Sequence, residues 1–273
     1  MKRVMHAPVR PSGPGRTAAV SHWQAFTLIE LLVVIAIIAI LAAMLLPVLA
    51  TAKTHAKIKK AQMEMSQIVT AVQAYESTYN RFPVSTNAQF WATGANEDFT
   101  YGVDFLRSNT PAITGLLPGF YSTYAPNNSE VIAILMDLTN YPSTGQPTVN
   151  YNHVKNPQKN PFLNAHMSGD TVSSGVGTDL VYRDPWGNPY IITFDLNYDQ
   201  KARDAFYRLQ QVSKQSGQAG LNGLINSVDP NGSGNHFEES GTVMVWSLGP
   251  DKKFDPNAAA NLGFNKDNIL TWK

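Results

Sequence analysis

The sequence predicts an α+β protein in which a long N-terminal α-helix packs on a small antiparallel β-sheet domain with a long, loop-rich insertion. Three observations support this fold class. Residues 31–50 form an almost uninterrupted apolar run, and residues 61–79 carry one helical stripe of apolar side chains. Beyond residue 178, strand-like segments alternate with turn residues. The 273 residues have room for one or two domains.

Composition excludes several kinds of site. The chain has no cysteine, so it contains no disulfide, thiolate metal site or cysteine nucleophile. The formal net charge is +1, but residues 1–25 carry four basic side chains and no acid. The rest of the chain has 17 basic against 20 acidic side chains, a balance that argues against a nucleic-acid-binding surface. We therefore expect no nucleic-acid partner.

The apolar run predicts contact with a membrane. Every residue from Leu31 to Leu46 is apolar, and residues 47–50 extend the run to twenty. A helix of this length spans a hydrocarbon core of about 30 Å, and a buried helix of a soluble domain is seldom apolar on all faces. Three fates remain open: a permanent anchor, a Sec signal peptide cleaved after Ala52 at the small-residue pattern of residues 50–52, or cleavage ahead of the run.

The third fate is favoured by a resemblance. Residues 25–35, AFTLIELLVVI, resemble the processing site of type IV prepilins and type II secretion pseudopilins. The resemblance implies that a prepilin peptidase cleaves between Ala25 and Phe26, methylates the amino group of Phe26 and leaves Glu30 as the fifth mature residue. It also implies that Pro47, 21 residues after Phe26, kinks the helix. The chain departs from the family in having Ala25 where glycine is strongly preferred.

Two roles are compatible with Glu30. Thr27 and Glu30 have the spacing of a capping box, in which each side chain bonds a backbone N–H of the other residue. The resemblance implies a second role in assembly, in which Glu30 pairs with the Phe26 ammonium of a neighbouring subunit. An unpaired charge in a low-dielectric filament core is costly, so this pair would fix the axial register.

The pattern divides the chain into successive regions. After residue 50 the helix becomes amphipathic and ends before Pro83, with polar residues, Glu64 among them, placed away from the apolar stripe. The lysines between residues 53 and 60 are interpreted as a solvated face or a contact with lipid headgroups. The predicted regions are a leader (1–25), a transmembrane and polymerisation helix (26–52), its amphipathic continuation (53–82), an irregular insertion with a short helix near 129–138 (83–177) and a C-terminal β-sheet region (178–273).

The C-terminal region is expected to hold the sheet. Two strands are predicted around the turn DPWGNPY of residues 184–190, which also resembles a segment of major pseudopilins. Asp184 and Asn188 can hydrogen-bond their own backbone, which makes a purely structural turn the simplest interpretation. A helix followed by a loop is expected between residues 200 and 225, and residues 241–247 are expected to form the last strand.

A calcium site is implied by a second part of the same resemblance. Residues 247–251, SLGPD, resemble the start of the calcium loop of major pseudopilins. Since Ca²⁺ takes six to eight oxygen ligands, the Leu248 carbonyl and the carboxylates of Asp251 and Asp267 are the implied ligands, with Asp255 a weaker candidate. The alternative is a solvated loop without calcium, and no other cofactor is expected.

These features together predict a structural subunit and not an enzyme, because the scattered histidines belong to no catalytic motif. The resemblance implies a single-pass protein of a bacterial inner membrane with its C-terminal domain in the periplasm. Its expected partners are further copies of the chain, joined through their N-terminal helices, the prepilin peptidase, a secretion assembly platform and minor pseudopilins. The filament would serve type II protein secretion. The alternatives are a minor pilin or type IV pilus subunit, or a Sec-secreted soluble binding domain released after Ala52.

Overall fold

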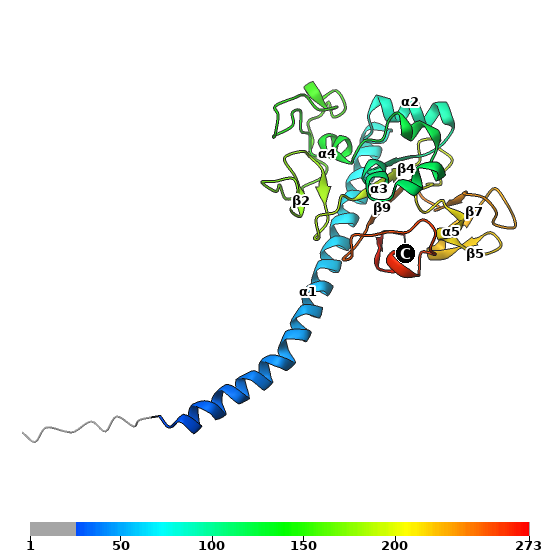
Figure 1. Ribbon diagram of the computed structural model, residues 1–273. Helices are drawn as coiled ribbons and strands as arrows, with labels where there is room; N and C mark the ends of the chain where they lie inside the picture. Colours follow the sequence, from blue (N-terminus) through cyan, green and yellow to red (C-terminus); the bar gives the residue numbers. More distant parts are fainter. Residues whose placement is uncertain (1–25, 273) are drawn as a thin grey trace, which may run out of the picture. The chain divides into compact units, whose positions relative to one another are not determined.

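The structure, a computed structural model, describes residues 26–272 (Figure 1). The predicted leader, including Ala25, lies outside these residues. The chain divides into two compact units, the first ending at Ala50 and the second beginning at Thr51. The fold class is α+β, as predicted: helix α1 (Leu28–Tyr79) is accompanied by antiparallel sheets.

The first unit contains the apolar part of α1. The helix begins at Leu28 and continues through Pro47. Every side chain from Phe26 to Ala50 is exposed. An 18-residue window of this helix reaches a mean hydropathy of 3.2 with none of its residues buried, so the segment is long and apolar enough to cross a membrane.

The second unit contains the amphipathic part of α1, which ends at Tyr79 as the stripe predicted. The stripe is buried: Ala61, Met65, Ile68, Val72 and Tyr75 are all fully inaccessible to solvent.

The prediction for Glu64 was wrong, because this residue is only 6 % exposed. At 3.6 residues per turn it lies about 60° from Ala61, at the edge of the buried stripe. The hydroxyl of Tyr190 donates a hydrogen bond of 2.6 Å to Glu64 Oε2 and satisfies the carboxylate there. Burial raises the pKa of Glu64 above its ordinary value.

The central sheet is antiparallel and has the strand order β1-β4-β9-β10. Its strands are β1 (Phe99–Tyr101), β4 (Ile191–Phe194), β9 (Val243–Ser247) and β10 (Ile269–Leu270). Side chains alternate between its two faces. Ile192, Phe194 and Val245 join the cluster that contains the buried stripe of α1. Ile191 and Trp246 join a second cluster on the opposite face.

Two smaller antiparallel sheets complete the strand topology. One consists of β2 (Gly175–Val176) and β3 (Tyr182–Arg183). The other has the order β5-β6-β7-β8, formed by β5 (Lys214–Ser216), β6 (Ala219–Gly220), β7 (Ile225–Asn226) and β8 (Phe237–Glu238).

Short helices connect these strands. The α-helices are α2 (Thr86–Ala95), α3 (Val103–Asn109), α4 (Ser129–Leu135) and α5 (Gln210–Ser213). The 3₁₀ helices are η1 (Pro111–Leu116), η2 (Gly119–Ser122), η3 (Tyr151–His153), η4 (Leu221–Gly223) and η5 (Gly263–Asp267).

The region 83–177 is more regular than predicted. The short helix expected near 129–138 is α4, but α2, α3 and β1 also form here. Ser85 caps α2 by accepting a hydrogen bond of 3.1 Å from the backbone N–H of Ala88. Strand β1 pairs with β4, with Phe99 opposite Phe194, so this region supplies a strand of the central sheet and is not simply an insertion.

Two predictions for the C-terminal region were also wrong. Between residues 200 and 225 only the four residues of α5 are α-helical, and strands β5 and β6 and the helix η4 follow it. Residues 241–247 do contain the predicted strand, β9, but it is not the last, because β10 pairs with it from residues 269–270. Around the turn of residues 184–190, Arg183 at the end of β3 forms an isolated antiparallel bridge with Pro189, which precedes β4, and the backbone N–H of Tyr190 donates to the Tyr182 carbonyl at 3.0 Å.

Candidate processing site and C-terminal loop

The start of α1 has the geometry of a capping box. The backbone N–H of Thr27 donates to Glu30 Oε2 at 2.8 Å, and the Thr27 hydroxyl donates to the same oxygen at 2.6 Å. In return, the backbone N–H of Glu30 donates to Thr27 Oγ1 at 3.3 Å. Since the helix begins at Leu28, Thr27 occupies the N-cap and Glu30 the third helical position.

This geometry accounts for an acid at the head of an apolar helix. The carboxylate occupies the end of the helix where the backbone N–H groups are unpaired and the macrodipole is positive. Phe26, directly before the cap, is 75 % exposed. In the full chain its nitrogen is a peptide nitrogen; cleavage ahead of it would place an ammonium four residues from Glu30. The role of Glu30 in assembly stays a prediction.

The turn of residues 184–190 is organised around a buried carboxylate. Asp184 is fully buried and accepts hydrogen bonds from the backbone N–H groups of Trp186 and Asn188, at 2.8 and 2.9 Å, and from Asn188 Nδ2 at 2.9 Å. Burial raises its pKa, against the opposing effect of these donors. The predicted bonds of Asp184 and Asn188 to the local backbone are therefore present.

The same turn is bonded to the C-terminal loop, 60 residues further along the chain. The Ser247 hydroxyl donates to Asp184 Oδ2 at 2.5 Å, and Asn188 Nδ2 donates to the Gly249 carbonyl at 3.1 Å. The backbone N–H of Gly249 in turn donates to Ser247 Oγ at 3.0 Å. The turn of residues 184–190 and the segment of residues 247–249 thus form one hydrogen-bonded unit, which spacing along the sequence did not reveal.

Two of the four predicted calcium ligands come together. Gly249 has a φ of +70°, and its backbone packs so closely against the Asp267 carbonyl that a Cβ there would clash. Burial raises the pKa of the Asp267 carboxyl, and the charge of Asp251 raises it further, as expected for two neighbouring carboxylates. Asp267 Oδ1 and Asn268 Oδ1 are buried, and neither has a hydrogen-bond partner among the described residues. These oxygens fit the needs of a hard cation.

Asp255 takes no part in that pair. Its carboxylate accepts a hydrogen bond of 2.9 Å from the backbone N–H of Asn257, and its own N–H donates to Asn265 Oδ1 at 2.8 Å. Leu248, the fourth predicted ligand, has a fully buried side chain that packs in the second core cluster. Within residues 26–272, no three side chains of His, Cys, Asp or Glu gather as a metal-binding group.

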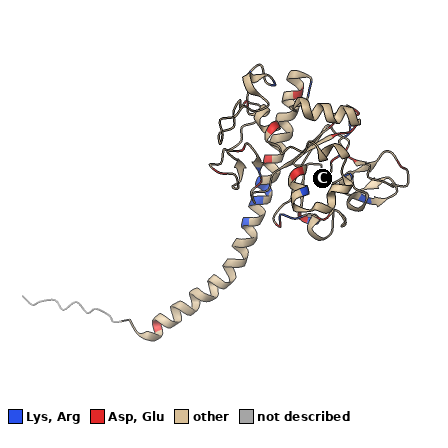
Figure 2. Cartoon of the chain, turned by 45° about the horizontal axis from the view of Figure 1, so that its top comes forward, with Lys and Arg blue, Asp and Glu red and all other residues tan. Residues whose placement is uncertain are grey.

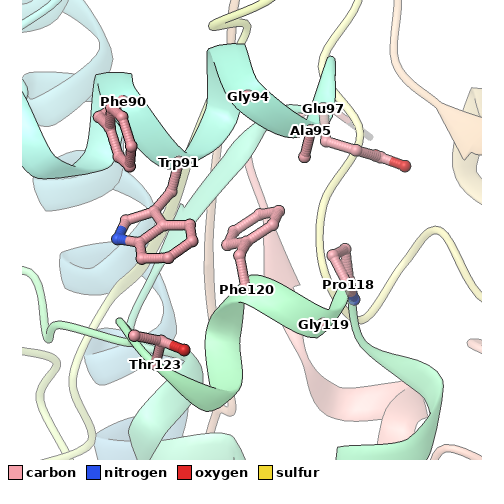
Figure 3. Close-up of a pocket in the computed structure, with 9 residues that line it drawn as sticks. All are labelled: Phe90, Trp91, Gly94, Ala95, Glu97, Pro118, Gly119, Phe120 and Thr123. Carbon is pink, nitrogen blue, oxygen red and sulfur yellow. The ribbon is translucent and has the colours of Figure 1, made fainter.

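An aromatic cleft of about 580 Å³ was missed by the sequence analysis (Figure 3). Phe90 and Trp91 of α2 line it with Phe120 of η2, and the Phe90 ring, 67 % exposed, lies 5.4 Å from that of Trp91. Glu97 contributes a carboxylate that is already paired with the guanidinium of Arg208, at 3.1 and 3.2 Å. The adjacent aromatic residues Phe90 and Trp91 were the only indication of this cleft in the sequence.

Comparison with known proteins bears on the N-terminal site. Residues 24–46 match the family model described as the prokaryotic N-terminal methylation motif. Searches of curated proteins and of solved structures gave no match to this chain.

The motif, the capping box and the long apolar helix together make this N-terminus similar to that of prepilin-type proteins. The chain accordingly resembles a type IV pilin-like subunit, and its α+β fold is consistent with that class. The motif implies processing by a prepilin peptidase, a role in pilus-type assembly and anchoring in a membrane.

Proposed function

We propose that this chain is a structural subunit of a periplasmic pseudopilus that serves type II protein secretion, and that it has no enzymatic role. It would be anchored in a bacterial inner membrane by residues 26–52, cleaved between Ala25 and Phe26, methylated at Phe26 and polymerised through α1. The observation that carries the proposal is the methylation motif of residues 24–46 at the start of an exposed apolar helix. The assembly platform and minor pseudopilins would be its partners.

The N-terminus of the mature protein tests this proposal. We expect mass spectrometry of the chain purified from its native membrane to give N-methylated Phe26 as the first residue. A first residue of Lys53 would mean that a Sec signal peptide had been removed and would contradict the proposal. Purified fibres in which the chain is a trace component would favour a minor pilin over the main subunit.

Glu30 gives a sharper test of polymerisation. Glu30→Gln keeps a side chain that can complete the capping box but removes the charge that would pair with a neighbouring ammonium. Leaving that ammonium unpaired in an apolar core costs about 3–5 kcal/mol per subunit, so we expect Glu30→Gln and Glu30→Val to insert in membranes but form no fibres. Fibre yield by electron microscopy is the measurement; normal fibres from Glu30→Gln would restrict Glu30 to capping.

Calcium binding in the C-terminal loop is part of the proposal. Asp251, Asp267 and the Leu248 carbonyl would ligate Ca²⁺. The charge of the ion would offset the repulsion between the two carboxylates. At a hundredfold excess over its Kd, Ca²⁺ should stabilise the domain by about 2.7 kcal/mol, seen as a higher Tm. Asp267→Asn should abolish the increase, while Asp255→Asn, the matched control outside the pair, should retain it. An unchanged Tm in the native chain would contradict the site.

A further inference from the structure

A band of lysines follows the apolar part of α1. Lys53, Lys57, Lys59 and Lys60 are all exposed, and Figure 2 shows blue segments, which mark Lys and Arg, close together on the helix ribbon where it enters the domain. No acidic residue occurs from residue 31 to residue 63. The next acid, Glu64, is buried and lies 3.7 Å from Lys60 Nζ. The band is therefore a positive surface with little internal compensation.

Three of these lysines share one face of α1. Lys53, Lys57 and Lys60 are spaced by four and three residues, which places them one above the other. The Lys57 ammonium lies 5.8 Å from the centroid of the Trp186 ring. Lys60 Nζ donates to Ser174 Oγ at 3.2 Å. This face of the helix consequently runs beside the turn at Trp186 and the loop of residues 170–174.

That loop and turn add an exposed apolar side chain and a further lysine. Val172 is 72 % exposed. Its backbone carbonyl lies against Gly187, and Lys252 Nζ lies 3.9 Å from the point where a Cβ on Gly187 would sit. Two acids are close by along the chain. Asp170 accepts hydrogen bonds from the backbone N–H groups of its own loop, and Asp251 accepts one of 2.9 Å from the backbone N–H of Lys253.

We propose that this surface binds the headgroups of anionic phospholipids when the subunit is anchored in the membrane. We call it the basic collar, defined as Lys53, Lys57, Lys60, Val172, Trp186 and Lys252. The inference rests on the proposed function, because it requires that the apolar segment be inserted in a bilayer.

Position along the chain and charge both favour this partner. Lys53 and Lys60 follow Ala50 by three and ten residues, which limits their distance from it to about 36 Å even for a fully extended chain. Lysines and tryptophans are typical of membrane–water interfaces, where an ammonium reaches the phosphates while its stem and the indole stay in apolar surroundings. Anionic headgroups attract such basic segments within about a Debye length.

The absence of cysteine from the chain allows a specific test. The full chain carrying Val172→Cys, labelled with an environment-sensitive fluorophore, is reconstituted in vesicles of phosphatidylcholine alone or with about 30 mol % phosphatidylglycerol. We expect quenching of the label by brominated lipid to be about threefold stronger in the anionic vesicles and to fall at about 0.5 M salt. A label at Val228→Cys, an exposed valine outside the collar, should respond equally in both.

Variants of the three helical lysines separate the effect of their charge on lipid binding from any effect of the substitutions on folding. Lys53→Gln/Lys57→Gln/Lys60→Gln should lose the difference between the two vesicle types, and the corresponding triple arginine variant should keep it. Equal quenching in both types for the native chain, with the chain floating with the vesicles, would overturn the collar and leave the anchor intact. Failure to float with either vesicle type would overturn the anchor, and with it the inference. Quenching that the triple glutamine variant retains would assign the contact to Val172 and Trp186 alone and would also overturn it.

Discussion

Both parts of α1 carry many apolar side chains. The parts differ in where these side chains lie. From residue 26 to residue 50 every side chain is exposed, whereas Ala61, Met65, Ile68 and Val72 are buried completely. The second part meets its own domain, and the first part must find an apolar partner outside the chain. The apolar side chains of the second part are removed from water by the domain, whereas those of the first part need apolar surroundings from outside the chain.

The largest expected difference between the two parts is their response to pH. Residues 26–50 contain one titratable side chain, Glu30, whereas the domain buries several carboxyls. Burial raises the pKa of Asp98 to about 7, and the charges of Asp195 and Asp199 also raise it. The folded domain then holds a proton that the unfolded chain releases near its ordinary pKa of 3.8.

The direction in which the stability of the domain changes with pH follows from this difference in the pKa of Asp98. Between about pH 4 and pH 7 the folded state binds more protons than the unfolded state, so stability is full at the acidic end and falls by about 4 kcal/mol toward pH 7. Denaturant unfolding of the domain at several pH values measures the slope. Asp98→Asn should flatten it; an unchanged slope would mean that Asp98 is ionised throughout.

Methionines give a matched comparison of packing in the two parts. Met65 is fully buried in the domain core, whereas Met44 in the apolar part is 68 % exposed and Met63 is 56 % exposed. Met65→Ala should lower the free energy of unfolding of the domain by about 3 kcal/mol, through lost burial and the cavity left behind. Thermal unfolding in detergent should show Met44→Ala and Met63→Ala within about 0.5 kcal/mol of the native chain. An equal loss at Met44 would mean that the apolar part is already packed within the chain.

The smallest effect is expected at the start of α1. Thr27→Ala removes the side chain that caps the helix and should cost about 1 kcal/mol of local helix stability. Amide hydrogen exchange of residues 28–31 in micelles should accelerate about fivefold, with no change in the Tm of the domain. Thr27→Ser, which keeps the hydroxyl, is the control and should exchange like the native chain.

Strong periodicity explains which parts of the fold were predictable. The bounds of α1, its buried stripe and the capping box all follow from patterns within a few residues of one another. The bonds of Asp184 and Asn188 are equally local. Strand β1 has only three residues and is defined by its pairing with β4, more than ninety residues away, so no local pattern indicates it.

Tertiary context also overrode local propensity. A helix followed by a loop is expected from the sequence between residues 200 and 225, but Lys214–Ser216 pairs with Ala219–Gly220 in a β-hairpin instead. At Gly220, at the end of the second strand, a Cβ would meet the Leu224 carbonyl at 2.8 Å, a close approach of the backbone that composition does not reveal. The candidate calcium loop shows the same limit, because the resemblance implied Asp251, Asp255 and Asp267 together, whereas of the other two carboxylates Asp251 raises the pKa of Asp267 and Asp255 bonds within its own turn.

Strand β1 has a practical consequence for anyone who shortens this protein. It pairs with one edge of β4, so excision of residues 83–177 as a dispensable insert would leave the N–H and C=O groups on that edge unpaired, while the other edge of β4 stays paired with β9. An exposed edge strand of this kind can pair with strands of other chains, which leads to aggregation of the protein. Aggregation of such a trimmed variant would therefore result from the uncovered edge of β4. It would not be evidence about filament formation through the N-terminal helix.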